Sequence, residues 1–146
     1  MSTQDLVFVY GTLRSEIPSS MSKLLRRRAR LIGPATTAGY LIDLGGYPAL
    51  VLTPAASGER VQGEVYAVHP DRAEETWQLL DAYEGVTGQP SEQYRKAEID
   101  VLQDHRPLRA ATYVYQLAAD GYPVIAGGDY PSFYLSAPAH RQFTGH

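Results

Sequence analysis

The sequence predicts one domain of the α+β class over residues 1–146, and three observations lead to this prediction. The chain is long enough to bury a core, and 44% of its residues are hydrophobic. Several separated stretches either alternate apolar and polar residues or run continuously apolar, as strands do. One stretch in mid-chain instead repeats apolar residues at the spacing of an amphipathic helix. Separated strands beside one strong helix are typical of α+β proteins.

The first predicted strand is the apolar run Leu6-Val7-Phe8-Val9-Tyr10, which stops at Gly11. Thr12 and Leu13 then continue in what we expect to be a tight loop. Glycine permits backbone angles that a side chain would forbid. A corner of this kind can direct consecutive main-chain N–H groups into one concavity, where an anion binds. An ordinary turn after a strand fits the same residues, so the segment alone leaves both interpretations open.

A basic segment follows this loop. We expect Ser19 or Ser20 to cap a short helix that runs through Leu25. Such a cluster of cations can mark a surface that binds nucleic acid or an acidic partner. We favour a solvated helix face, because the net charge of the chain is −3 and no aromatic residue interrupts the cluster. The cations are Lys23, Arg26, Arg27, Arg28 and Arg30.

Extended segments are predicted on both sides of a turn at residues 45–48. Gly33-Pro34 is expected to separate an extended segment over residues 31–33 from another over residues 36–44. Residues 49–52 and 61–68 are predicted strands. In the second of these, Glu64 alternates away from the apolar face, so we expect it to be exposed rather than to face a polar interior.

The clearest predicted helix begins after His69-Pro70. Asp71 is expected to be its N-cap, because Glu74 follows at the spacing of a capping box. Gly85 lies where the helix should stop. Glu84 therefore lies at the C-terminal end of the helix, on or beside its apolar stripe. Burial and the negative end of the helix dipole should both raise the pKa of this carboxyl group. The stripe consists of Ala73, Trp77, Leu80 and either Tyr83 or Glu84.

An antiparallel hairpin is predicted in the second half of the chain. Residues 94–102 alternate in polarity, residues 103–107 form a turn, and residues 108–115 form the second strand. Residues 121–131 are rich in glycine and proline, so we expect little regular structure there. The tail that ends at His146 is expected to lie over the surface.

Composition and spacing argue against several kinds of site. The chain has no cysteine, which excludes disulfides, thiolate catalysis and cysteine-bound zinc. Gly11-Thr12 lacks the lysine of a phosphate-binding loop. No apolar stretch approaches the ~20 residues that cross a bilayer, and the polar N-terminus favours the cytoplasm. The histidines lack metal-ligand spacing, so no metal site is predicted. They are His69, His105, His140 and His146.

Two motifs resemble those of the γ-glutamylcyclotransferase-like family, which includes γ-glutamylamine cyclotransferases and the plant avirulence-induced, or AIG2-like, proteins. They are Tyr10-Gly11-Thr12-Leu13-Arg14 and Leu79-Leu80-Asp81-Ala82-Tyr83-Glu84-Gly85. The similarity runs from about Leu6 to about Tyr130, and it implies a small mixed β-barrel flanked by helices. Further matching segments are Gly39-Tyr40-Leu41, Gly46-Tyr47-Pro48-Ala49-Leu50, Tyr94-Arg95-Lys96 and Gly128-Asp129-Tyr130.

The resemblance implies a cyclisation that releases 5-oxoproline and a free amine from a small γ-glutamyl amine or peptide. The α-amine of the substrate attacks its own γ-carbonyl, so the enzyme mainly supplies positioning. Glu84 would act as the general acid and base, and no cofactor is needed. The family's loop, matched by Tyr10, Gly11, Thr12 and Leu13, holds the glutamyl end through main-chain N–H groups. Tyr94 and Tyr115 are expected to add hydroxyl groups to the cavity, and Tyr47 and Pro48 to form a wall.

Other interpretations stay open at this point. Glu84 could instead be a helix-terminal carboxylate paired with a nearby Arg or Lys. The chain could also be a domain that binds a small ligand without turnover, or an interaction protein that uses its basic segment. Residues 15–20 lack an Asn-His pair that some relatives carry, and Gly128-Asp129-Tyr130 replaces the more usual Gly-Asp-Trp. These departures affect the side of the cavity that would receive the leaving amine, whose identity stays open.

Overall fold

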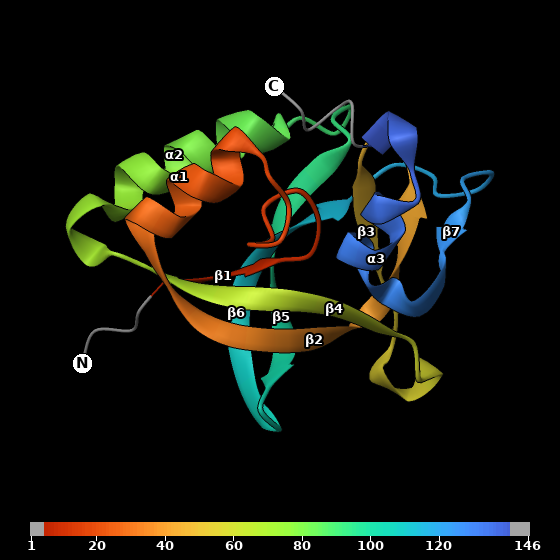
Figure 1. Ribbon diagram of the computed structural model, residues 1–146, viewed down its shortest axis with the longest axis horizontal. Helices are drawn as coiled ribbons and strands as arrows, with labels where there is room; N and C mark the ends of the chain where they lie inside the picture. The colour runs from red at the N-terminus through yellow and green to blue at the C-terminus, as the bar shows by residue number, and fades with distance from the viewer. Residues whose placement is uncertain (1–4, 141–146) are drawn as a thin grey trace.

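The computed structural model describes residues 5–140, and its strands form one mixed sheet that closes into a five-stranded barrel (Figure 1). The ring runs β1–β4–β2–β3–β6 and returns to β1. Neighbours are antiparallel from β1 to β3, whereas β6 pairs in parallel with both β3 and β1. The predicted α+β class and the mixed barrel implied by the resemblance are confirmed. The bounds are β1 Leu6–Val9, β2 Ala29–Asp43, β3 Pro48–Leu52, β4 Arg60–Val68 and β6 Arg106–Tyr115.

Further elements extend and cover the barrel. Strand β5 (Tyr94–Gln103) pairs with β6, and the short β7 (Val124–Ile125) pairs with β2. Helices α1 (Ser20–Arg28) and α2 (Ala73–Glu84) lie side by side on one side of the barrel, and α3 (Tyr130–Leu135) lies on another (Figure 1). None of the helices within residues 5–140 is both long and apolar enough to cross a membrane.

Strand β1 is buried on both faces, which explains its continuous apolar sequence. It lies between β4 and β6, where Val7 is opposite Tyr66 and Ala111. Phe8 belongs to the core inside the barrel. Val7 and Val9 belong to a second core, which also contains side chains of α1 and α2. Because β1 packs into both cores, the position at which the following loop begins is fixed.

The segment around Gly33-Pro34 bends a strand rather than ending it. β2 runs without interruption from Ala29 to Asp43, so the predicted separation of two extended segments is wrong. The pairing of β2 with β4 shifts register between Leu31 and Gly33, which is a β-bulge. A bulge accommodates an extra residue and turns the strand, and this curvature helps a barrel to close.

The predicted helix ends are partly confirmed. Ser19 caps α1, since its Oγ accepts a hydrogen bond from Ser22 N at 3.0 Å. Gly85 ends α2 in the left-handed conformation, with φ of 71°. The predicted capping box of Asp71 is wrong: residues 70–72 form a 3₁₀ turn, and α2 begins after Arg72 without a side-chain cap. Proline fixes its own φ and favours this short turn ahead of the helix.

The glycine-rich segment near the C-terminus is more ordered than predicted, because it contains β7 and leads into α3. Tyr130 is fully buried, and its hydroxyl lies 2.7 Å from His140 Nδ1. His140 Nε2 lies 2.6 Å from Asp43 Oδ1 at the end of β2. This hydrogen-bonded chain fastens the segment after β7 to the barrel. His146, the end of the predicted surface tail, lies outside the described residues.

Two further predictions concern single elements. The hairpin of β5 and β6 is confirmed, and its tight turn places Asp104 and His105 at φ of 55° and 64°. The predicted exposure of Glu64 is wrong, because only 7% of its surface is accessible. The loop after β1 covers this side of β4, and Ser15 donates two hydrogen bonds to the Glu64 carboxylate.

Candidate active site

A cavity of about 310 Å³ lies where the end of β1, the end of α2 and the start of β5 meet. Six of its sixteen lining residues are aromatic, and Glu84 supplies its acidic group. The residues described as lining it include no Lys or Arg. They are Phe8, Val9, Tyr10, Gly11, Thr12, Leu13, Tyr47, Pro48, Ala82, Tyr83, Glu84, Gly85, Gln93, Tyr94, Thr112 and Tyr113.

The loop after β1 contributes Tyr10, Gly11, Thr12 and Leu13 to the lining of this cavity. Arg14 N donates to Gly11 O at 3.0 Å and closes a tight turn. Within residues 5–140, no hydrogen bond occupies the N–H groups of Thr12 and Leu13. The Thr12 hydroxyl lies 2.8 Å from the Tyr83 hydroxyl on α2, which links the loop to the helix that carries Glu84. The loop can therefore offer consecutive donors to an anion.

Gly11 is required because a side chain would not fit there, and not because the backbone needs an unusual conformation. Its φ is not positive, so backbone conformation does not demand glycine here. A Cβ at this position would lie 2.7 Å from Pro48 Cγ, which is closer than side chains normally approach. The absence of a side chain lets the loop lie directly against β3 at the wall of the cavity.

Glu84 is the last residue of α2 and lies partly exposed in the cavity lining. Burial raises the pKa of its carboxyl group to about 7, because the surrounding protein replaces water that would stabilise the charge. Within the described chain, no Lys or Arg forms an ion pair with it. This geometry differs from the alternative of a helix-terminal glutamate neutralised by a neighbouring cation.

Five tyrosines line the cavity: Tyr10, Tyr47, Tyr83, Tyr94 and Tyr113. Burial raises the pKa of Tyr10 and of Tyr94 well above the usual value, and the charge of Glu84 adds to both effects. Both hydroxyls therefore stay protonated at neutral pH. Tyr10 donates to Tyr113 O at 2.7 Å, and Tyr94 donates to Pro48 O at 2.7 Å. Each hydroxyl thus holds two segments of the wall together. Tyr94 is among the lining residues, and its hydroxyl is used in the bond to Pro48 O.

The structure does not bring Tyr115 into the cavity lining. Tyr115 lies two residues beyond Tyr113 on β6, so both point to the same side of the strand. Its ring instead meets the edge of Tyr122, with ring centroids 6.0 Å apart. Tyr113 and Tyr83 are the cavity tyrosines that our sequence reasoning missed. Tyr83 directly precedes Glu84 in the same sequence motif, so its place in the cavity could have been predicted from that motif.

The last turn of α2 is clamped to the barrel by Asp81. The Tyr113 hydroxyl donates to Asp81 Oδ1 at 2.6 Å, and Lys96 Nζ lies 3.3 Å from the same oxygen. Lys96 also lies over the ring of Trp77, 4.6 Å from its centroid. Because Asp81 precedes Glu84 by about one helical turn, these contacts anchor the turn of α2 from which Glu84 projects.

Replacing Tyr113 by phenylalanine should loosen this clamp. We expect a loss of about 1 kcal/mol in the free energy of unfolding, because a partly exposed carboxylate loses one of its donors and keeps Lys96. Urea unfolding measures this change. Tyr40→Phe is the matched control, because the hydroxyl of Tyr40 has no hydrogen-bond partner within residues 5–140. Equal stability of the two variants would contradict the clamp.

Among the residues of the described range, no group of three or more His, Cys, Asp or Glu side chains is arranged to hold a metal ion.

A known protein family matches most of this chain. The profile of the family described as "Gamma-glutamyl cyclotransferase, AIG2-like" matches residues 7–132. No curated protein sequence gives a significant match. The match to the family covers the loop after β1, the whole of α2 and the start of α3.

Several solved structures share the fold. YkqA from Bacillus subtilis is 26% identical with a TM-score of 0.68; the alignment covers 92% of this chain and 42% of that chain. YtfP from Escherichia coli is 28% identical with a TM-score of 0.57, and the alignment covers 86% of this chain and 95% of that chain. An AIG2-like protein from Mus musculus is 22% identical with a TM-score of 0.67, covering 88% and 89%, and this likeness shows the fold alone. The present chain thus spans less than half the length of the Bacillus protein.

Proposed function

Because this chain belongs to the gamma-glutamyl cyclotransferase, AIG2-like family, we propose that it cyclises γ-glutamyl amines or peptides to 5-oxoproline and a free amine. The observation that carries the proposal is the position of Glu84. A carboxyl group with a pKa of about 7 lines the same cavity as Thr12 and Leu13, whose N–H groups have no hydrogen-bond partner within residues 5–140. One wall can thus bind an anion while the other exchanges a proton at neutral pH.

The proposed reaction uses these two features in turn. The N–H groups of the loop bind the α-carboxylate of the substrate, since the described lining offers no cation for it. The Glu84 carboxylate takes a proton from the α-ammonium group. The freed amine attacks the γ-carbonyl carbon, and the new C–N bond closes the five-membered ring. The bond to the leaving amine breaks as Glu84 gives that amine the first proton. Glu84 then takes the second proton from the ring nitrogen, which leaves a neutral lactam, and passes it to the released amine, so Glu84 ends as it began.

A substrate screen tests the function directly. Purified protein is incubated with γ-glutamyl amines and γ-glutamyl peptides, and released 5-oxoproline is measured by mass spectrometry. We expect release from at least one class. No release from any member, by a folded protein that also fails to bind 5-oxoproline, would favour another function.

The rate of the reaction should depend on pH through Glu84. The carboxyl group is protonated below its pKa of about 7 and cannot then accept a proton from the substrate. We therefore expect kcat/KM to rise with pH, with a midpoint near 7 on the acid side of the profile. Steady-state rates between about pH 5 and pH 9 measure this. A profile that is flat through neutral pH would contradict the role of Glu84.

The basic segment is proposed to be structural rather than a nucleic-acid site. Arg28 Nη2 lies 3.1 Å from Glu75 Oε1, and Arg26 Nη1 donates to Ser15 O at 2.8 Å, so two of the cations already have acidic or carbonyl partners. We expect only weak, salt-sensitive binding to oligonucleotides, with Kd no tighter than about 1 μM near physiological salt. Titration of fluorescent single- and double-stranded oligonucleotides measures it. Tighter binding would support an interaction protein.

We further propose that residues 1–146 form a single domain that acts in the cytoplasm on a small-molecule substrate. The support is that one continuous sheet includes strands from Leu6 to Ile125. The absence of cysteine suits a reducing compartment.

A further inference from the structure

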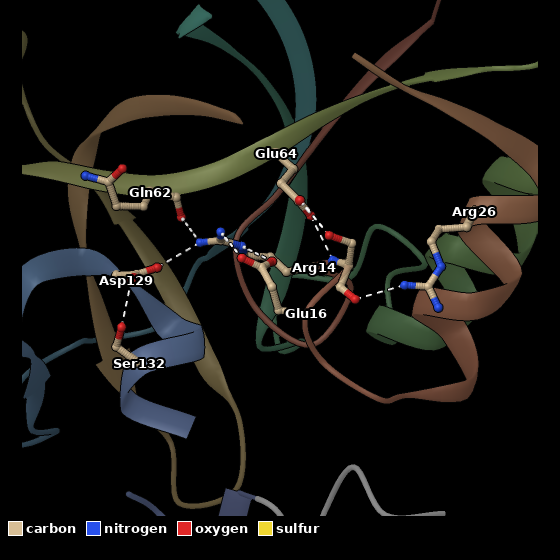
Figure 2. A network of polar contacts seen from close by, with 8 residues as sticks. Arg14, Glu16, Arg26, Gln62, Glu64, Asp129 and Ser132 are labelled. Atoms are coloured by element: carbon tan, nitrogen blue, oxygen red, sulfur yellow. Dashed lines mark hydrogen bonds and ion pairs between the residues drawn. The ribbon is translucent and has the colours of Figure 1, made fainter. Parts of the chain in front are cut away.

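The side chain of Arg14, next to the loop that lines the cavity, is built into the protein rather than aimed at a ligand. Only 8% of Arg14 is exposed. Its guanidinium group donates to the Glu16 carboxylate through Nε at 3.2 Å and Nη2 at 2.9 Å, and to Asp129 Oδ1 through Nη1 at 2.9 Å (Figure 2). Nη1 also lies 3.4 Å from Gln62 O on β4. Two carboxylates thus neutralise this one cation.

A second buried charge holds the next residue of the loop. Glu64 on β4 accepts hydrogen bonds from Ser15 N at 2.8 Å and from Ser15 Oγ at 2.7 Å (Figure 2). Ser15 O in turn accepts from Arg26 on α1 at 2.8 Å. The main-chain N–H and C=O groups of Ser15 are therefore both fixed by charged side chains, and charge-assisted hydrogen bonds are stronger than neutral ones.

A third contact fixes the loop from within. Ser19 Oγ donates to Thr12 O at 2.7 Å while it caps α1. The carbonyl side of the Thr12–Leu13 peptide is thereby occupied, and its N–H group, which lies on the opposite side of a trans peptide, stays available to a ligand. The loop is thus held by β4, by α1 and, through Asp129, by the start of α3. Asp129 itself accepts from Ser132 Oγ at 2.9 Å, which fixes its orientation on α3 (Figure 2).

None of the charged residues in this network lines the cavity. They cannot touch a ligand there, so they act through the main chain of the loop. We propose that Arg14 is a positioning residue that, with Asp129 and Glu64, holds residues 11–15 in the conformation that binds the substrate's α-carboxylate. The ligand-binding part of this inference rests on the function proposed above. Through Asp129, the segment before α3 would also help to shape the site, although it is distant in sequence from the loop.

The test is Arg14→Gln, with Arg14→Lys as the conservative variant. Amide hydrogen exchange of residues 11–15, followed by NMR or mass spectrometry, reports the loop whether or not the protein turns over. We expect exchange there to become at least tenfold faster in Arg14→Gln, and KM for a γ-glutamyl substrate to rise about tenfold with kcat within about twofold. The pH midpoint of kcat/KM should stay near that of the wild type, because Glu84 is untouched. Arg14→Lys should recover part of the KM.

Arg109→Gln is the matched control, because it breaks an exposed ion pair with Asp100 on the hairpin of β5 and β6. It should change neither loop exchange nor KM. Asp129→Asn is a smaller perturbation that removes the charge and keeps an acceptor, and it replaces Arg14→Gln if that variant does not fold. Wild-type loop exchange and KM in a folded Arg14→Gln or Asp129→Asn variant would overturn the proposal. Absence of turnover in the wild type would count against the proposed function instead, and loop exchange would then decide the role of Arg14.

Discussion

Glu84→Gln should lower kcat by about 10²–10⁴-fold while the protein stays folded and still binds 5-oxoproline. The amide has nearly the shape of the carboxyl group but cannot take a proton from the substrate and return one. Because the side chain of Glu84 makes no ion pair within the described chain, its replacement removes no structural contact of that kind. Steady-state rates, circular dichroism and calorimetric titration with 5-oxoproline measure the three parts of this prediction.

Glu74→Gln supplies the control for that experiment, since Glu74 is an exposed carboxylate in the first turn of the same helix. It should leave kcat unchanged. A folded Glu84→Gln variant that keeps nearly full activity would remove Glu84 from the proposed mechanism.

Glu84→Gln should also reveal how much the partly buried Glu84 carboxylate destabilises the folded protein. The pKa of Glu84 is about 7 in the folded protein and close to 4.5 in an unfolded chain. Between these values the folded state binds more protons, so the free energy of unfolding falls as pH rises and levels off above about 7. Glu84→Gln should lack this fall and should therefore be more stable than the wild type at alkaline pH. Urea unfolding at acidic and alkaline pH compares the two proteins.

Gly11→Val should weaken the binding of 5-oxoproline by tenfold or more, equivalent to about 1.4 kcal/mol. A Cβ at residue 11 would lie 2.7 Å from Pro48 Cγ, and the proline ring offers little freedom to move away. The loop would have to leave β3, which would turn the N–H groups of Thr12 and Leu13 out of line. Calorimetric titration measures the affinity, and circular dichroism confirms folding.

Two comparison variants sharpen this second result. Gly11→Ala adds only the first carbon of the side chain and should give a smaller loss in the same direction. Ala55→Val enlarges an exposed turn between β3 and β4 and should leave affinity unchanged. Wild-type affinity in a folded Gly11→Val variant would contradict binding at this loop.

Several elements that depend on neighbouring residues were predictable from the sequence, although the local signals at Asp71 and Gly33-Pro34 misled, whereas elements that depend on distant residues were not predictable. The β5–β6 hairpin, the cap at Ser19 and the stop at Gly85 are local features, and the structure has all three. Periodicity carries no information on the parallel pairings of β6 with β1 and β3, which close the barrel. The barrel was expected only through the resemblance to a family.

The residues of the candidate site likewise include some that were predictable from local motifs and some that were not. Its loop and Glu84 lie in two short motifs and were expected, and both line the cavity. Asp81 and Tyr113 were not expected, because their contact depends on which strand faces the end of α2. Glu64 was misplaced for a related reason: alternation along β4 shows which side chains share a face but not that a loop will cover that face.

The pairing of Val7 with Ala111 has a consequence for how the protein folds during synthesis. The first strand emerges from the ribosome early, yet one of its two partners is made only when the chain has grown past Ala111. Proteins with many such distant pairings have high contact order and fold in milliseconds to seconds rather than microseconds. Until β6 arrives, the apolar edge of β1 is open to wrong partners. We therefore expect the loop after β1 to be among the last parts of the chain to become ordered, and nascent chains that end before Ala111 to be the most prone to aggregate.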